Sequence, residues 1–183
     1  TLAPLYVSLF LNTAPFMIYF GEEVGEKGMD EEGFSGRDGR TTIFDWWSVA
    51  SIRRLRKLIA SGKYRSSSVS ELVENGLMKE EAELFLRFTE AIRFAAEDCS
   101  IRQGTTYDLC YCNMSSDGFD KNRHFVFLRD YEEHTLLIAA NFSNRVAVMK
   151  LVIPEHAFEW MGIPKTEALH PGKVIEVKVQ PMD

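Results

Sequence analysis

The stretch Ala14–Gly25 reads APFMIYFGEEVG, and the interpretation of the whole chain starts from it. Pro15–Phe20 is a short apolar run, which predicts a strand buried on both faces, as in a parallel sheet or barrel, although a buried helix has the same pattern. Gly21 then ends the run and leads into a loop that begins with Glu22 and Glu23. Carboxylates that directly follow a barrel strand lie at the end of the barrel where active sites form.

A second motif, GRDGRTTIFDWW, follows at Gly36–Trp47. Together the two motifs resemble the last barrel strand, and the loop after it, of the alpha-amylase superfamily, glycoside hydrolase family thirteen. In most members of that family the corresponding sequences are close to PGTPFIYYGEE and then RDPMRTPMQW. The matching residues are Pro15, Phe16, Ile18, Tyr19, Gly21, Glu22, Glu23, Arg37, Asp38, Arg40, Thr41 and Trp46. The chain departs from the family at Thr13 and Gly39 and has one extra residue between Arg40 and Trp46, so the loop is free to take a different course.

The resemblance implies an α+β fragment made of two parts. Residues 1–103 would be the end of a (β/α)8 barrel, with helices and one strand, and residues 104–183 would be an all-β antiparallel sandwich domain. In this interpretation Leu2–Leu11 is the seventh barrel helix, Pro15–Phe20 is the eighth strand and Lys79–Glu97 is the eighth helix.

The residue pattern supports helices independently of the family. In Ser48–Lys63, apolar residues recur every three or four positions and Gly62 ends the run, with Arg53, Arg54, Arg56 and Lys57 expected on the solvent face. Tyr64–Asn75 is expected to be a loop or short helical turn. Lys79–Glu97 carries one apolar stripe, formed by Leu84, Phe85, Phe88, Ala91, Ile92 and Ala95.

From Thr105 the pattern changes to period two and β-branched residues, which is typical of strands. The expected strands are TYDLCYC, HFVFLRDY, TLLIAANF, RVAVMKLVI and KVIEVKVQ, with turns such as the one at Ser116–Gly118 between them. Several short strands joined by tight turns favour an antiparallel sandwich.

The resemblance implies that the parent protein is a retaining glycosidase or transglycosidase that acts on the α-glucosidic bonds of starch-type glucans. The family's three catalytic carboxylates lie on earlier barrel strands, and no segment of this chain resembles them, so no catalytic residue is assigned and the chain alone is expected to be inactive. Arg40 and Asp38 are the candidate substrate-binding residues, because the family Arg that matches Arg40 reaches the sugar beside the cleaved bond. The alternative is an Arg–Asp surface pair that only holds the loop. Trp46 is expected to pack inside, whereas stacking on a sugar remains open for Trp46 and Trp47.

Composition excludes some classes of partner and cofactor. The net charge of −6 argues against a nucleic-acid surface, and Leu2–Phe20 is interrupted by polar residues and prolines, which makes it a poor membrane span. Cys110 and Cys112 are expected on one face of a strand without the further ligands that zinc needs. The acidic run Asp30–Glu32 lacks the spacing of a calcium loop, and the four histidines are scattered, so no metal and no cofactor is expected.

A second hypothesis is a non-catalytic β-sandwich that binds carbohydrate or serves as a structural module. An exposed aromatic row across one sheet face would favour it, and Tyr107, Tyr111, Phe125 and Phe127 have the required alternation, although such rows more often belong to cores. If the chain is a barrel fragment, Leu2–Phe20 lacks its usual covering, and self-association, strand exchange or local disorder is expected there.

Overall fold

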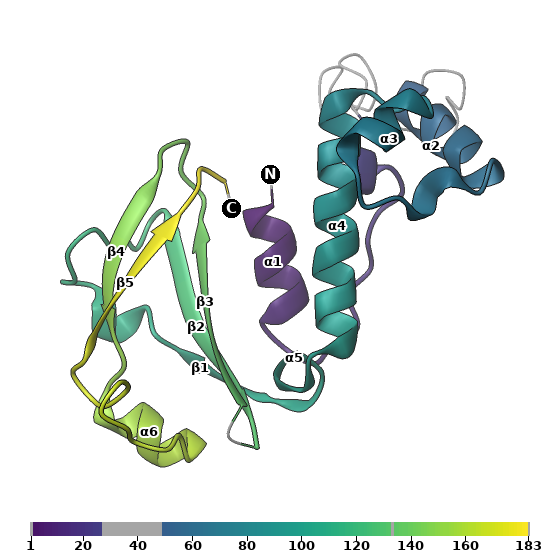
Figure 1. Ribbon diagram of the computed structural model, residues 1–183. Coiled ribbons are helices and arrows are strands. Elements are labelled where there is room, and N and C mark those ends of the chain that lie inside the picture. Colours follow the sequence, from purple (N-terminus) through teal and green to yellow (C-terminus); the bar gives the residue numbers. More distant parts are fainter. Residues whose placement is uncertain (1, 27–48, 133, 183) are drawn as a thin grey trace, which may run out of the picture. The chain divides into compact units, whose positions relative to one another are not determined.

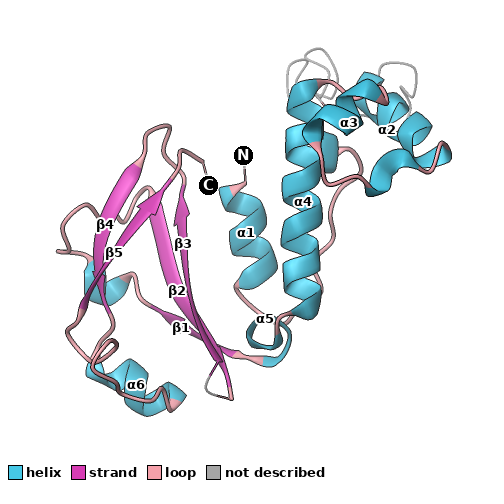
Figure 2. Ribbon diagram, in the orientation of Figure 1, coloured by secondary structure: helices cyan, strands magenta, loops and turns pink. Residues whose placement is uncertain are grey.

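A computed structural model describes residues 2–26, 49–132 and 134–182. Within these ranges the protein is mixed α+β, with six α-helices and two antiparallel sheets (Figures 1 and 2). The helices are α1 (Ala3–Phe10), α2 (Ala50–Ala60), α3 (Val69–Glu74), α4 (Lys79–Glu97), α5 (Cys99–Gln103) and α6 (Glu155–Met161). The strands are β1 (Thr105–Asp108), β2 (His124–Tyr131), β3 (His134–Asn141), β4 (Ala147–Val152) and β5 (Val174–Val179).

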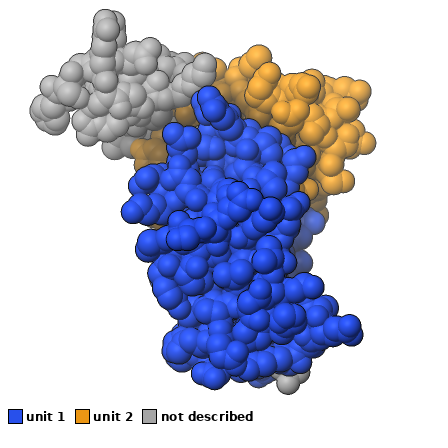
Figure 3. All heavy atoms as spheres, turned by 90° about the vertical axis from the view of Figure 1, so that its left-hand side faces the viewer, with its two compact units in different colours: residues 1–16, 91–183 blue, residues 17–90 orange. Residues whose placement is uncertain are grey.

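The chain divides into two compact units, which Figure 3 shows in different colours. Unit 1 contains residues 1–16 and 91–183, and unit 2 contains residues 17–90. The division falls within α4, whereas the sequence suggested a boundary between residues 103 and 104. The units differ from that expectation because α1 belongs with the strands: the N–H groups of Leu2 and Ala3 both donate to the carbonyl of Met182.

Both sheets of unit 1 contribute to one hydrophobic core. The first sheet has the order β1-β2-β3, with Tyr107 opposite Leu128 and Leu128 opposite Leu137, and the second pairs β4 with β5. The core residues are Tyr107, Leu109, Phe119, Val126, Leu128, Ala147, Met149, Leu151, Ile153, Ala157, Phe158, Ile163 and Val179. This core forms because alternate residues of each strand point to the same face.

β2 is buried on both of its faces. Val126 and Leu128 belong to the shared core, and the alternating residues Phe127 and Arg129 are equally buried on the opposite face. Arg129 donates to the carbonyls of Ser100 and Ile101, which lie within α5, and to that of Leu11, which directly follows α1. A buried guanidinium needs such acceptors, and here they fasten two helices to the central strand.

Unit 2 is built around α2, α3 and the first half of α4. Its core contains Val24, Leu55, Leu58, Leu72, Leu77 and Ala82. The side chain of Ser68 accepts a hydrogen bond from the N–H of Glu71 and caps α3. Gly62, with φ of 73°, follows α2, which confirms the helix end predicted from the sequence. Leu58 is fully buried, whereas Ile59, which lies four positions after the buried Leu55, is half exposed.

The strand predicted at Pro15–Phe20 is wrong. Pro15–Tyr19 has no regular secondary structure, and Phe16, Met17, Tyr19 and Phe20 are all exposed, Met17 by 86%. A strand needs a neighbour for its N–H and C=O groups, and no strand in the described part of the chain precedes Thr105. The apolar side chains of this segment therefore lie on the surface, and its backbone does not join a sheet.

Four of the five predicted strands are confirmed, and the first is shorter than predicted. β1 ends at Asp108, and Tyr111–Asn113 forms a 3-10 turn. Cys110 and Cys112 are therefore not on one face of a strand, because the chain turns here and the side chain of Asn113 bonds to the carbonyls of Leu109 and Val152. None of the helices in the described ranges combines the length and apolar content needed to cross a bilayer.

Candidate functional site

Most of the residues that the sequence assigned to sugar contact lie outside the described residues. Arg40 and Asp38, the two candidate substrate-binding residues, fall in residues 27–48, as do Arg37, Trp46 and Trp47. The acidic run Asp30–Glu32 falls there too. The structure does describe both flanks of this segment, Gly21–Glu26 on one side and the start of α2 on the other.

The acidic residues before this segment bond to backbone groups. Glu22–Val24 is a 3-10 turn between Gly21 and Gly25, which both have positive φ. The Glu23 carboxylate accepts a hydrogen bond from the N–H of Gly21, with 2.9 Å between the nitrogen and the oxygen. This bond is local, so Glu23 holds the turn closed.

Glu26 connects the two flanks. Its carboxylate accepts a hydrogen bond of 2.8 Å from the N–H of Ile52, in the first turn of α2. The first N–H groups of a helix lack partners within the helix, and an acidic group there is favoured by the helix dipole. The hydrogen bond therefore links described residues that lie on the two sides of residues 27–48 in the sequence.

One member of the basic cluster on α2 is not on a solvated face. Arg54 forms a forked ion pair with Glu81 of α4, with 2.8 Å between Nε and Oε2, and Glu81 also accepts from the N–H of Met78. Hydrogen bonding from Arg54 lowers the pKa of Glu81 to about 2. Glu81 is almost fully buried, so this pair links α2 to α4 inside unit 2.

The most developed surface site in the described residues is an aromatic group on unit 1, which we call the Tyr107 cluster. It consists of Tyr107, Tyr111, His156 and Trp160. Tyr107 lies at its centre, with ring centroids 6.2 Å from Tyr111, 5.8 Å from His156 and 5.9 Å from Trp160. Tyr107 is buried, whereas Tyr111 is 52% exposed and Trp160 is 56% exposed.

Hydrogen bonds fix the polar edge of this cluster. The Tyr107 hydroxyl lies 2.5 Å from the Tyr111 hydroxyl and 3.1 Å from Nδ1 of His156. Burial, together with the hydrogen bond to Tyr111, raises the pKa of Tyr107, so its hydroxyl stays neutral. The cluster therefore combines exposed ring faces with positioned hydroxyl and imidazole groups, which suits a ligand that has both an apolar face and hydroxyls.

The sequence found only part of the Tyr107 cluster. It grouped Tyr107 and Tyr111 with Phe125 and Phe127 as one row, but Phe127 is fully buried and Tyr111 is not on a strand. His156 and Trp160 were missed, although their spacing of four on a helix is a signal that they share a face. They contact Tyr107, which lies about 50 residues earlier in the chain, and a local sequence pattern cannot predict such a tertiary contact.

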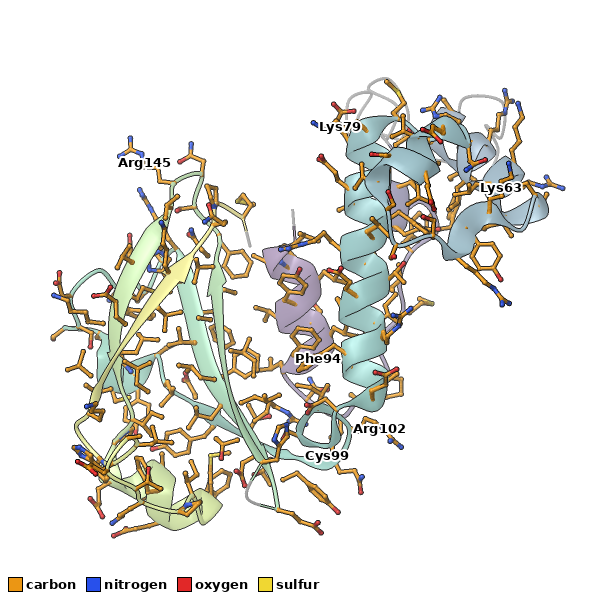
Figure 4. All side chains as sticks on the ribbon, viewed as in Figure 1. Lys63, Lys79, Phe94, Cys99, Arg102 and Arg145 are labelled. Atoms are coloured by element: carbon orange, nitrogen blue, oxygen red, sulfur yellow. The ribbon has the colours of Figure 1, made fainter. Side chains whose placement is uncertain are left out.

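A shallow pocket lies elsewhere on unit 1. It is lined by Arg123, Phe142, Ser143, Asn144, Arg145 and Met182, and Figure 4 labels Arg145 among them. Arg123 pairs with Asp120 at 3.4 Å. The pocket is open and has no positioned group comparable to Tyr107, so it is the weaker candidate.

The three cysteines are free thiols. Burial raises the pKa of Cys110 to about 11, and burial also raises the pKa of Cys112. Thiols with raised pKa are poor nucleophiles because little thiolate is present near neutral pH. Cys110 and Cys112 are therefore structural residues of the β1 region.

No family model, curated protein or solved structure matches this chain in comparisons with known proteins.

Proposed function

We propose that this chain is the C-terminal region of an alpha-amylase superfamily glycosidase, with the end of a (β/α)8 barrel followed by an antiparallel β-sandwich domain. The observation that carries the proposal is the pair of motifs APFMIYFGEEVG and GRDGRTTIFDWW, which follow one another in the family's order, with one extra residue between Arg40 and Trp46. The succession of helices followed by two antiparallel sheets with a shared core is compatible with it.

The geometry of the acidic turn supports the proposal in one further respect. The family treats the acidic pair after the last strand as structural, and in this chain Glu23 bonds to the backbone of its own turn. The bond between Glu26 and Ile52 links residues on the two sides of the segment that contains Asp38 and Arg40.

In the parent enzyme two carboxylates about 5 Å apart would cleave the α-glucosidic bond with retention of configuration, one as nucleophile and one as acid and base. These groups are not assigned to any residue of this chain. Arg40 and Asp38 would contribute directed hydrogen bonds to vicinal hydroxyls of the sugar, because a guanidinium donates in a fork and a carboxylate accepts. The partner is thus an α-glucan or maltooligosaccharide, and neither nucleic acid nor a membrane is proposed.

The test compares reducing-sugar release from starch, pullulan and maltooligosaccharides by this chain and by the full-length product of the same gene. We expect activity only in the longer protein, and there Arg40→Lys should lower kcat/KM by about tenfold or more, which corresponds to one lost charged hydrogen bond. Arg56→Lys, on the exposed face of α2, is the matched control and should leave activity unchanged. Hydrolysis by the short chain alone would refute the proposal and direct attention to Glu22, Glu23 and Asp38.

A second candidate function is carbohydrate binding without catalysis, and the Tyr107 cluster favours it. Exposed rings of Tyr111 and Trp160 offer stacking faces to a pyranose, and the hydroxyls and His156 offer hydrogen bonds. Titration of this chain with maltoheptaose by calorimetry tests it. Binding that is lost in Trp160→Ala and kept in Arg145→Ala, which changes the shallow pocket, would support a binding module. If no heat of binding is measured, the binding-module function is refuted and only the glycosidase proposal remains.

A further inference from the structure

Three side chains with metal-binding atoms meet in unit 1, and none of them belongs to the Tyr107 cluster. Asp98, Cys99 and His134 each offer one ligand atom, and these atoms lie within 4.8 Å of one another. No local pattern in the sequence groups these residues, because His134 is 35 positions after Cys99. The four histidines were interpreted from the sequence as structural or surface residues, and the fold places one of them, His134, beside two other possible ligands.

From this geometry we propose that Asp98, Cys99 and His134 bind one divalent ion of the zinc class. The inference does not depend on the proposed glycosidase function. Imidazole nitrogen, thiolate sulfur and carboxylate oxygen are the three ligand types that zinc takes in proteins, and the presence of sulfur disfavours calcium and magnesium. Three protein ligands leave the fourth tetrahedral position to a water molecule or another small ligand.

The distances suit a tetrahedral ion. Nε2 of His134 and Oδ2 of Asp98 are 3.0 Å apart. Two ligand atoms that each lie about 2.0 Å from a tetrahedral ion are roughly 3.3 Å apart, and a sulfur and a nitrogen ligand are roughly 3.6 Å apart. The pair thus needs a shift of only a few tenths of an ångström, and the Cys99 sulfur, which lies within 4.8 Å of both atoms, needs a shift of at most about 1 Å.

The backbone that carries these ligands is well anchored. Asp98 caps α5, because its Oδ1 accepts from the N–H groups of Ser100 and Ile101, and this leaves Oδ2 directed to His134. The Ser100 hydroxyl donates to the carbonyl of His134. Arg129, which is buried, donates to the carbonyls of Ser100 and Ile101. Such supporting bonds fix the direction of ligand side chains before any ion arrives.

A purely structural explanation accounts for only two of the three residues. An ion pair between Asp98 and His134 would join α5 to β3 without a metal. It leaves Cys99 unexplained: its thiol is free, is partly accessible, and makes no hydrogen bond in the described part of the chain. Figure 4 labels Cys99 at the start of α5. With an ion bound, this thiol would be a metal ligand, and coordinate bonds would connect α5 to β3.

The test is a titration of the whole reduced, metal-free chain with Co²⁺, followed by competition with Zn²⁺. We expect one Co²⁺ per chain, with the near-ultraviolet charge-transfer band of a thiolate bound to cobalt, and displacement by Zn²⁺. Cys99→Ser should abolish the band, and His134→Ala should weaken affinity at least about tenfold. Cys110→Ser and His170→Ala are matched controls that remove another thiol and another imidazole, and they should bind as the unchanged chain does.

A stability measurement provides a second readout. An ion that binds only the folded protein raises its unfolding temperature. We expect Zn²⁺ to raise that temperature for the unchanged chain and for Cys110→Ser, and not for Cys99→Ser. Failure of the unchanged chain to bind one equivalent would overturn the proposal, and so would a cobalt–thiolate band that survives in folded Cys99→Ser. Neither result bears on hydrolysis by the longer protein.

Discussion

At the scale of single residues, the ion pair between Arg54 and Glu81 is the clearest case of a charge with a structural task. Glu81 is nearly buried and serves two elements, because it accepts from Arg54 of α2 and from the N–H of Met78 at the start of α4. Removing one partner of such a pair leaves the other charge poorly compensated.

We predict that Glu81→Ala lowers the free energy of unfolding by about 2 kcal/mol, because Arg54 and the first turn of α4 both lose an acceptor. Glu83→Ala is the matched control on the same helix, since Glu83 is exposed and pairs with Lys79 only at 3.8 Å. That control should cost less than about 0.5 kcal/mol. Urea unfolding followed by helical circular dichroism measures both values, and equal losses would contradict the structural role of Glu81.

The same pair predicts a dependence on pH. The pKa of Glu81 is lowered to about 2, below the value of about 4.3 expected for an unfolded chain. Between these values the unfolded state binds more protons than the folded state, so this stability is present above about pH 4.3 and is lost as the pH falls toward 2. Glu81→Gln lacks this contribution. Its urea midpoint should therefore fall less than that of the unchanged chain between pH 5 and pH 3.

Residue patterns found the position of Arg54 but not its partner. The helical period placed it beside Arg53, Arg56 and Lys57, and a period describes only the helix itself. Glu81 lies 27 positions later, so the buried pair depends on how α2 packs against α4. The same limit explains why Asp98, Cys99 and His134, and likewise Tyr107 and Trp160, were not grouped from the sequence.

At the scale of elements, patterns worked where a segment's own residues determine its structure. The predicted segments at Lys79–Glu97 and His124–Tyr131 agree with α4 and β2 at both ends. The patterns failed where residues outside a segment determine the structure of that segment. Pro15–Phe20 has strand composition but no neighbouring strand, and Leu109–Cys112 leaves the sheet because Asn113 bonds to Leu109 and Val152.

The turn at Ser116–Gly118, which the sequence predicted, offers a test of close packing between elements. Gly118 has φ of 77°, and a Cβ atom there would lie 1.8 Å from the carbonyl oxygen of Val148 in β4. Gly172 has almost the same φ, 78°, with no atom within 4 Å of such a Cβ. The two positions therefore share the conformational cost of a left-handed residue and differ in the clash.

We predict that Gly172→Ala costs about 1 kcal/mol of unfolding free energy, the usual penalty for a left-handed alanine. Gly118→Ala should cost about 3 kcal/mol or more, because backbone of β4 must move. Thermal and urea unfolding of the two variants measure the difference. Similar costs would mean that the turn and β4 are not packed as closely as the structure has them.

At the scale of the whole molecule, the sequence predicted the coarse α+β class, and the two compact units divide the chain at other positions than the suggested domains. Mixed α+β structure with antiparallel sheets was expected and is observed. The assignment of α1 to the strand-containing unit depends on bonds such as those from Leu2 and Ala3 to Met182, which join residues near the two ends of the chain. Such contacts have no local signature.

The exposed apolar segment at residues 16–20 has a consequence for the molecule in solution. Phe16, Met17, Tyr19 and Phe20 are exposed next to one another in sequence, in backbone that is not used in any sheet. Contiguous apolar surface and unpaired backbone both favour association with another chain. We therefore predict that the protein self-associates through this segment at micromolar concentrations.

Replacement of Met17 and Phe20 by Ser should shift the chain toward monomer, because it removes two of the exposed apolar side chains without adding charge. The matched control replaces Val146 and Val174, which are also exposed and apolar, by Ser, and it should associate as the unchanged chain does. Sedimentation velocity over a range of concentrations distinguishes the two. The prediction would be contradicted if the unchanged chain stayed monomeric at all concentrations and residues 1–30 resisted protease. That result would mean that other parts of the chain cover this segment. It would also remove the main physical reason for expecting the rest of a barrel to cover it.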